Sequence, residues 1–174
     1  MRQLALIKNK SLSFGGTTGR RGPRPIDSKN SMHLILRSTQ ARGVQSFRTP
    51  ENQRKIDRII SKFSTKYAVR IHLQANVGNH LHFHVKLSHL RTYKPFIRAI
   101  TGAIAMAVAK TSRWCKAQRK FWDYRPFTRV VIGFRAFQKL NDYIRINQLE
   151  PHVGRADAEL MVRGDPEIER LLRG

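Results

Sequence analysis

Alternating hydrophobic and polar positions predict four β-strands. In residues 31–38, Met32, Leu34 and Leu36 share one face, and in residues 67–75 Val69, Ile71 and Leu73 do so, which leaves Arg70, His72 and Gln74 on the opposite face. Residues 77–87 alternate in the same way after the turn sequence NVGN, so they are expected to pair with the preceding strand as a hairpin. The short stretch FTRVVIG at 127–133 is the fourth predicted strand.

Hydrophobic residues at helical spacing predict three helices, in residues 49–67, 92–110 and 134–148. The first has Thr49 as a plausible N-cap and Pro50 at its first position. Apolar stripes run along these helices at Ile56, Ile59, Ile60 and Phe63, at Ile97, Ile100, Ile104 and Val108, and at Phe137, Leu140 and Ile144.

The order of these elements predicts an α+β fold. Strand, helix, strand, strand, helix, strand is the ferredoxin-like βαββαβ arrangement, a four-stranded antiparallel sheet with two helices on one face. The second face of the sheet is expected to be free, and the helix of residues 134–148 is additional to the six core elements. We expect a flexible basic arm at residues 1–30, one domain at 31–148 and a tail at 149–174 with a short helix near DPEIERLLR.

The charge of the chain points to an anionic partner. Lys and Arg total 34 against 11 acidic residues, a net charge of +23, and no carboxylate occurs between Asp57 and Asp123. A chain this basic repels itself unless an anion offsets its charge, which favours nucleic acid over an anionic membrane surface. The single cysteine, Cys115, excludes an internal disulfide and fits a reducing compartment, so we expect a cytoplasmic location of the bacterial type. No apolar run is long enough to span a bilayer.

Three histidines stand on one face of the third predicted strand. His80, His82 and His84 occupy every second position of GNHLHFHV, on the face away from the two helices. Neutral imidazoles two positions apart can hold one divalent metal ion and leave coordination positions open for substrate oxygens. The alternative is three exposed histidines that contact phosphate.

The last predicted helix brings a tyrosine next to an amide. Tyr143 and Asn147 of LNDYIRIN lie four residues apart and hence on one face, beside the apolar stripe of that helix. A phenol with a pKa of about 10 needs a metal or a base nearby to act as a nucleophile at neutral pH. A half-buried tyrosine at a helix edge, without catalytic role, is the alternative.

These motifs together resemble the HUH endonucleases, and among them the REP-associated tyrosine transposases. GNHLHFHV is similar to the NHxH form of the His-hydrophobic-His motif, MHLILR to the first strand of the family, KFWDYRPFTRVV to its aromatic segment, and LNDYIRIN to its YIxxN catalytic helix. The resemblance covers roughly residues 30–150. It departs from the family at His84, where an aliphatic residue is usual, and at Gln148, where a proline often follows the helix Asn.

The resemblance implies a mechanism and the residues that perform it. Tyr143 would be the nucleophile, and His80, His82 and Asn147 would hold Mg²⁺ or Mn²⁺; His84 and Gln148 are additional candidates for a metal or phosphate contact. The expected activity is metal-dependent cleavage and rejoining of single-stranded or hairpin DNA through a 5′-phosphotyrosine intermediate. Members of the family act as monomers or as homodimers that exchange catalytic helices, and both arrangements are open here.

Candidate contacts to the DNA backbone lie on the predicted histidine face and in the N-terminal arm. They are Arg37, Arg70, His72, Lys86, Arg20, Arg21 and Arg24. A competing hypothesis is a non-catalytic nucleic-acid-binding protein on the same scaffold, which the fold and the charge fit equally well. Common single-strand readers carry aromatic residues on the central strands, whereas His and Arg occupy those positions here, which favours a metal site.

Overall fold

The computed structural model describes residues 24–110 and 120–164 and has the predicted α+β architecture. In chain order, the elements are β1 (Ser31–Arg37), the short 3-10 helix η1 (Gly43–Gln45), α1 (Pro50–Lys66), β2 (Val69–Asn76), β3 (His80–Leu87), α2 (Leu90–Ala109), β4 (Phe127–Val131), α3 (Phe134–Val153) and α4 (Arg155–Arg163). The strands form one antiparallel sheet in the order β2-β3-β1-β4. This is the strand order of the ferredoxin-like arrangement, so the predicted fold is confirmed.

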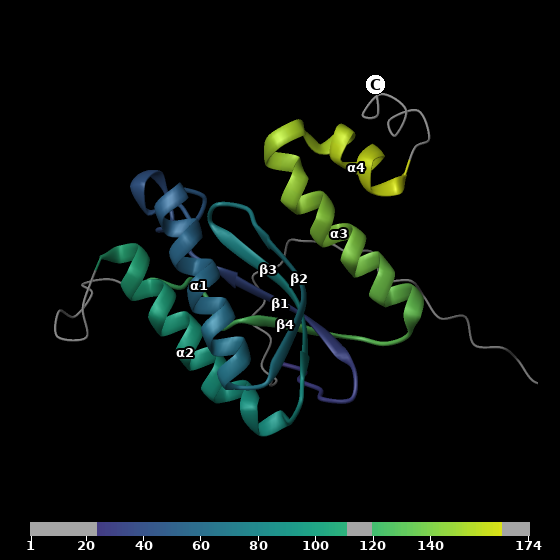
Figure 1. Cartoon of the computed structure of the whole chain (residues 1–174), viewed down its shortest axis with the longest axis horizontal. Coiled ribbons are helices and arrows are strands. Elements are labelled where there is room, and N and C mark those ends of the chain that lie inside the picture. Colours follow the sequence, from purple (N-terminus) through teal and green to yellow (C-terminus); the bar gives the residue numbers. More distant parts are fainter. Residues whose placement is uncertain (1–23, 111–119, 165–174) are drawn as a thin grey trace, which may run out of the picture.

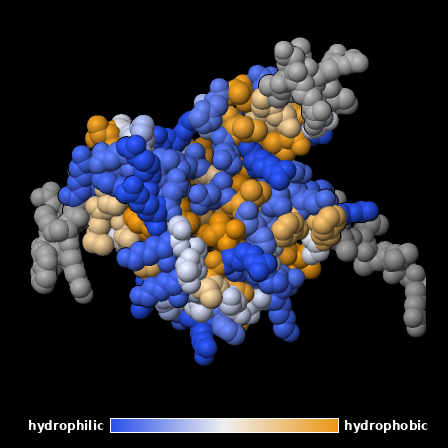
Figure 2. All heavy atoms as spheres, in the orientation of Figure 1, coloured by the Kyte–Doolittle hydropathy of each residue, from blue (hydrophilic) through white to orange (hydrophobic). Residues whose placement is uncertain are grey.

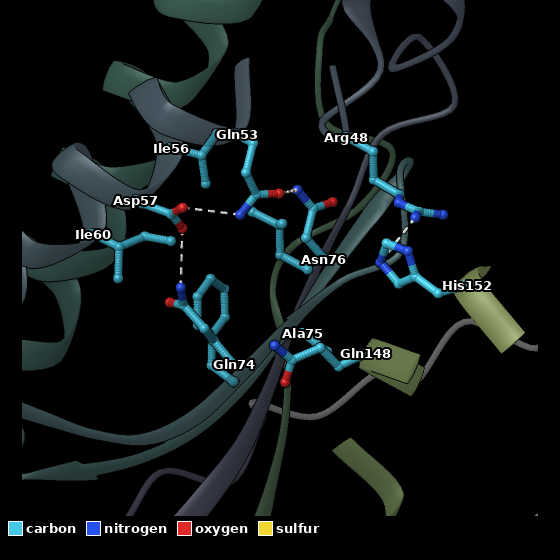
Figure 3. Close-up of a pocket in the computed structure, with 12 residues that line it drawn as sticks. Arg48, Gln53, Ile56, Asp57, Ile60, Gln74, Ala75, Asn76, Gln148 and His152 are labelled. Atoms are coloured by element: carbon cyan, nitrogen blue, oxygen red, sulfur yellow. Dashed lines mark hydrogen bonds between the residues drawn. The ribbon is translucent and has the colours of Figure 1, made fainter. Parts of the chain in front are cut away.

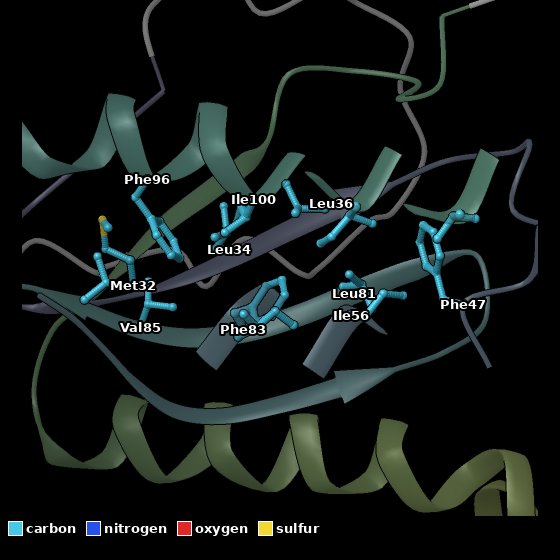
Figure 4. Packing of buried hydrophobic residues seen from close by; sticks show 14 of the residues in the cluster. Met32, Leu34, Leu36, Phe47, Ile56, Leu81, Phe83, Val85, Phe96 and Ile100 are labelled. Carbon is cyan, nitrogen blue, oxygen red and sulfur yellow. The ribbon is translucent and has the colours of Figure 1, made fainter. Parts of the chain in front are cut away.

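The hydrophobic core lies between the sheet and the pair α1 and α2. Figure 4 shows alternate residues of β1 and β3 pointing from the sheet toward Ile56 of α1 and toward Phe96 and Ile100 of α2. Phe83 is 1% exposed and Ile100 is fully buried. The alternation and the two helical stripes read from the sequence therefore define this core, which fixes which strand residues face the opposite side.

The sequence had led us to expect that the opposite face of the sheet is free. The structure shows that it is covered. Helix α3 lies across it, so the sheet is sandwiched between α1 and α2 on one side and α3 on the other (Figure 1). Leu140 and Ile144 of α3 pack with Ala75 of β2 and Val131 of β4 in a second hydrophobic cluster. The apolar stripe of α3 needs a surface to bury it, and the small and apolar residues of this face supply one.

Strand β2 departs from the predicted alternation. A register irregularity between Ile71 and Leu73 pairs Leu73 with His84 and Gln74 with Phe83. Leu73 consequently packs in the α3 cluster, whereas Gln74 hydrogen-bonds to Asp57 of α1. The expectation that Leu73 faces α1 and α2 and Gln74 faces away was wrong, because a β-bulge inserts one extra residue and reverses the faces beyond it.

The C-terminal end of the domain lies further along the chain than predicted. Helix α3 continues to Val153 with Pro151 in its last turn, and α4 follows directly, where the sequence had suggested a tail from residue 149. Gly154 separates the two helices with φ of +87°, a conformation that glycine adopts without strain. The helix expected near residues 165–173 lies outside the described residues.

At the other end, residues 24–30 of the predicted arm contact the sheet. The hydroxyl of Thr128 donates to the carbonyl of Pro25 at 2.6 Å, and Arg24 lies over the ring of Phe127. The rest of the arm, with Arg20 and Arg21, lies outside the described residues. None of the helices in the described ranges is long and apolar enough to cross a membrane.

Candidate active site between the sheet and helix α3

The sheet register gathers four histidines on the face that helix α3 covers. His33 of β1 pairs with His84 of β3, Ile35 with His82, and Arg37 with His80. All six side chains therefore lie on the face that α3 covers, and the ring of Tyr143 on α3 meets the histidines there. Tyr143 is edge-on to His82 with 5.5 Å between ring centroids, and edge-on to His33 at 5.8 Å.

His82 is the buried centre of this group. It is 2% exposed, its Nδ1 lies 3.1 Å from Nε2 of His33, and its Nε2 is buried with no hydrogen-bond partner among the described residues. Burial, with smaller effects of His80 and His33, lowers the pKa of His82 to about 3. For His33, burial is again the largest cause, and its pKa falls to about 4. Both imidazoles are therefore neutral at physiological pH, as a metal ligand must be.

His80 stands at the entrance of the same group. Its ring lies 4.7 Å from that of His82, and its Nδ1 is 2.6 Å from the side-chain oxygen of Asn79. Because an amide oxygen only accepts, Nδ1 of His80 carries the proton, and Nε2 keeps its lone pair. Burial and the charge of Arg37 lower the pKa of His80. Asn79 thus fixes the tautomer of His80 that suits a metal ligand.

Asn147 lies one helical turn beyond Tyr143 and is 7% exposed. Its Nδ2 donates to the backbone carbonyl of Tyr143 at 2.6 Å. This bond leaves Oδ1 without a protein partner among the described residues, and an amide oxygen is a ligand type that Mg²⁺ and Mn²⁺ prefer. Gln148, the lesser candidate, is exposed and lines a separate cavity described below.

His84 is used differently from its two neighbours. It is fully buried, and its Nδ1 lies 2.6 Å from Oδ1 of Asn141 on α3 while its Nε2 lies 2.7 Å from the hydroxyl of Ser31 on β1. Both ring nitrogens are occupied, so in this arrangement His84 ties α3 to the sheet. The burial of His82 and His84 also rules out the alternative of three exposed histidines.

The predicted DNA-contacting residues lie in three different environments. Arg70 and Lys86 are exposed and directly opposite each other in the sheet. Arg37 is exposed and lies 3.7 Å from the carboxylate of Asp123. His72 is half-buried against His84 and Phe137, and its Nε2 is buried without a partner in the described part of the chain, so this atom does not face solvent.

Two site residues were missed by sequence analysis, His33 and Asn141. The alternation of Met32, Leu34 and Leu36 puts His33 on the opposite face of β1, but its contact with His82 depends on the register of β1 against β3, which no local pattern reveals. Asn141 stands two residues before Tyr143 on the helix, and its role depends on how α3 crosses β3. One feature of the sequence could have identified His33: it is a titratable residue among the apolar residues of a predicted strand.

His80, His82 and Asn147 carry the kinds of donor atom that a divalent ion takes, two imidazole nitrogens and one amide oxygen. Nε2 of His82 is buried without a partner among the described residues, and its burial costs free energy unless it gains one. Among the described residues, no group of three or more His, Cys, Asp or Glu side chains is placed to hold a metal ion. A site here therefore needs an amide such as Asn147 as its third protein ligand.

Comparison with known proteins supports the fold assignment. A REP-associated tyrosine transposase, solved bound to a REP hairpin, superimposes with a TM-score of 0.60 at 14% identity, over 77% of this chain and 75% of that one. A candidate transposase from Deinococcus radiodurans R1 aligns at 14% identity and a TM-score of 0.46, over 76% of this chain and 98% of that one. No protein-family model and no curated protein matches the sequence. The chain thus has the fold of a REP-associated tyrosine transposase, as its motifs predicted.

Proposed function

We propose that the protein is a metal-dependent transposase-like enzyme that cleaves and rejoins single-stranded or hairpin DNA. The observation that carries the proposal is the contact of the Tyr143 ring with the buried ring of His82, whose Nε2 has no hydrogen-bond partner among the described residues. The order and spacing of the His and Tyr motifs and the shared fold agree with it. The charge of +23 provides the attraction for a polyphosphate strand.

In this proposal the chain places each reacting group as follows. His80 and His82 would present their Nε2 atoms, and Asn147 its Oδ1, to Mg²⁺ or Mn²⁺, which would polarise the scissile phosphate and offset negative charge on its oxygens. Tyr143, held over His82 by the packing of α3, attacks the phosphorus through its phenolic oxygen, and its proton passes to water. The bond from phosphorus to the 3′ oxygen breaks, and that oxygen takes up a proton and leaves as a 3′ hydroxyl.

The product is a 5′-phosphotyrosine link, which keeps the phosphodiester bond energy and allows the strand to be rejoined without ATP. Tyr143 contacts histidines of its own chain, so one chain supplies all the proposed groups. We therefore favour a site that acts within a monomer, and a homodimer would not need to exchange helices.

Covalent capture of DNA tests this function. A labelled hairpin with a single-stranded flank is incubated with the protein and Mn²⁺, and the adduct is detected on a denaturing gel. Wild type should form an adduct that EDTA prevents, and Tyr143→Phe and His82→Ala should form none while retaining salt-sensitive binding. An adduct with Tyr143→Phe would show that the nucleophile is misassigned. Binding without any adduct in wild type would favour a non-catalytic nucleic-acid-binding protein.

A further inference from the structure

A cavity of about 290 Å³ lies at the β2 edge of the sheet, between α1 and the C-terminal part of α3 (Figure 3). Ala75 and Asn76 of β2 line it, and they pair in the sheet with His82 and Leu81 respectively. The cavity is thus next to the proposed metal ligands along the same strands, and Gln148 from α3 reaches its rim. Neither the fold nor the proposed cleavage chemistry uses it.

The floor of the cavity is apolar and its wall is polar. Ile56, Leu81 and Phe83 belong to the core and form the floor. On the wall, Asp57 accepts hydrogen bonds from Gln53 at 2.9 Å and from Gln74 at 3.0 Å. Figure 2, in the orientation of Figure 1, shows one face of the whole molecule, with hydrophobic residues near its middle and hydrophilic residues around them. A flat, partly apolar ligand with polar edges suits such a surface.

The polar wall is held in a fixed orientation. Gln74 turns its amide nitrogen to Asp57, which leaves its amide oxygen and one N–H available to a ligand. Each oxygen of Asp57 accepts one bond from a glutamine and can accept another. Amide and carboxylate groups held in this way read the hydrogen-bonding edge of a nucleobase.

The charges of the cavity favour a base in its interior and a phosphate at its rim. Asp57 places a carboxylate inside the cavity, which disfavours phosphate there, while Arg48 stands at the rim with Nη2 3.2 Å from Nε2 of His152. A nucleotide can therefore direct its base inward and its phosphate toward Arg48. Because carboxylate oxygens accept hydrogen bonds, the cavity favours a base that carries an amino group, namely adenine, cytosine or guanine. Thymine offers only its N3–H, which lies between two carbonyl oxygens that a carboxylate repels.

We propose that this cavity binds one unstacked, amino-bearing nucleobase of the single-stranded DNA that flanks the cleavage site. The inference rests on the proposed function, because it takes DNA as the substrate and places the base next to the cleavage site. At about 290 Å³ the cavity is at the lower end of the size of ligand pockets, which fits one base and not a longer segment. It would give the protein sequence preference at one flank position, in addition to the unspecific attraction of its charge.

The test measures binding without cleavage. Full-length protein in EDTA is titrated, by fluorescence anisotropy, with a DNA hairpin whose single-stranded flank carries an abasic site or a thymine at one position at a time. At one position both changes should weaken binding by about tenfold in wild type, since contacts to a single base are typically of this size. Gln74→Ala and Asp57→Asn should reduce this difference to about twofold or less, and so should Gln148→Ala at the exposed rim.

Gln138→Ala is the matched control, because Gln138 is an exposed glutamine of α3 that does not line the cavity. It should leave the tenfold difference unchanged. The inference is overturned if no flank position shows the difference in wild type, or if the position that shows it is insensitive to all three cavity variants. If Tyr143 forms the covalent adduct but binding shows no base preference, the proposed function stands and the cavity proposal fails. If binding shows the base preference but no adduct forms, the cavity proposal stands and the proposed function fails.

Discussion

Nε2 of His33 lies 3.1 Å from Nδ1 of His82, and the two rings are stacked with 5.3 Å between their centroids. This contact joins the middle of β1 to the middle of β3 beneath Tyr143. If His82 donates its Nδ1 proton to His33, its Nε2 keeps a lone pair directed away from β1. A histidine ligand is commonly held in this way by a second group that accepts its other N–H. His33 would then act through His82 as a positioning residue and not as a ligand.

The first prediction concerns this positioning role. His33→Ala should weaken Mn²⁺ binding by about 10- to 100-fold, the usual effect of losing a partner of a metal-bound histidine. His33→Gln should retain most of the affinity, because its amide oxygen can accept the same proton. Isothermal titration calorimetry with Mn²⁺ checks both variants, and the nitrogen chemical shifts of His82 in metal-free protein report its tautomer. His89→Ala, at an exposed histidine before α2, is the control. Unchanged Mn²⁺ affinity in His33→Ala would remove His33 from the site.

The second prediction concerns pH. The pKa values of His33 and His82 in the folded protein, about 4 and about 3, lie below the ordinary value of 6.5. Between these values the unfolded chain binds more protons than the folded one, so the free energy of unfolding rises with pH and is lost as pH falls below about 6.5. Each group contributes a slope approaching 1.4 kcal/mol per pH unit, or about 2 kcal/mol between pH 7.5 and pH 5.

Denaturant titrations of the metal-free protein at several pH values measure this slope. Burial also lowers the pKa values of His72, His80 and His84, which add to the slope. His33→Gln removes one of these contributions and should make the slope between pH 6.5 and pH 5 shallower, whereas His89→Gln, at an exposed position, is the control. A stability that stays constant over this range would mean that the two imidazoles are not buried as neutral groups.

Most of the fold, but not the arrangement of the site, was predictable from sequence. Alternation in β1 and β3 and the stripes of α1 and α2 identify the core because burial is a local demand on every second or every third to fourth residue. The sequence of α3 does not indicate which surface its apolar stripe packs against. Its packing across the histidine face depends on the side chains of β2 and β4. The bulge at Ile71 and Leu73 is likewise set by pairing, which explains why Leu73 and Gln74 were assigned to the wrong faces.

The same reasoning explains why the roles of the histidines could not be separated from sequence. His82 and His84 are two positions apart on one strand and have the same apolar neighbours in sequence. They differ because Asn141 and Ser31 occupy both nitrogens of His84, whereas Nε2 of His82 has no partner in the described chain. Those partners come from a helix and a strand more than 50 residues away, so the distinction belongs to tertiary structure.

The third prediction concerns the attachment of α3. His84→Ala should lower the free energy of unfolding by about 1–3 kcal/mol, since it leaves the amide of Asn141 and the hydroxyl of Ser31 without their buried partner. Asn141→Ala should cost a similar amount, and the double variant should cost less than the sum, because both remove the same contact. Urea denaturation of the four proteins gives this coupling. Strict additivity would contradict a direct tie between His84 and Asn141.

The last prediction concerns the basic pair on the exposed part of the sheet. Arg70 and Lys86 face each other across β2 and β3, where two positive charges repel unless an anion lies between them. If they bind the DNA backbone, Arg70→Ala and Lys86→Ala should each weaken binding of single-stranded DNA and make the slope of log Kd against log salt shallower by about 0.7. Lys94→Ala, at an exposed lysine of α2 on the other side of the sheet, should leave that slope unchanged. Because the repulsion is relieved, the two variants should be at least as stable to heat as wild type in the absence of DNA. A salt slope equal to that of wild type in both variants would place the DNA elsewhere on this basic chain.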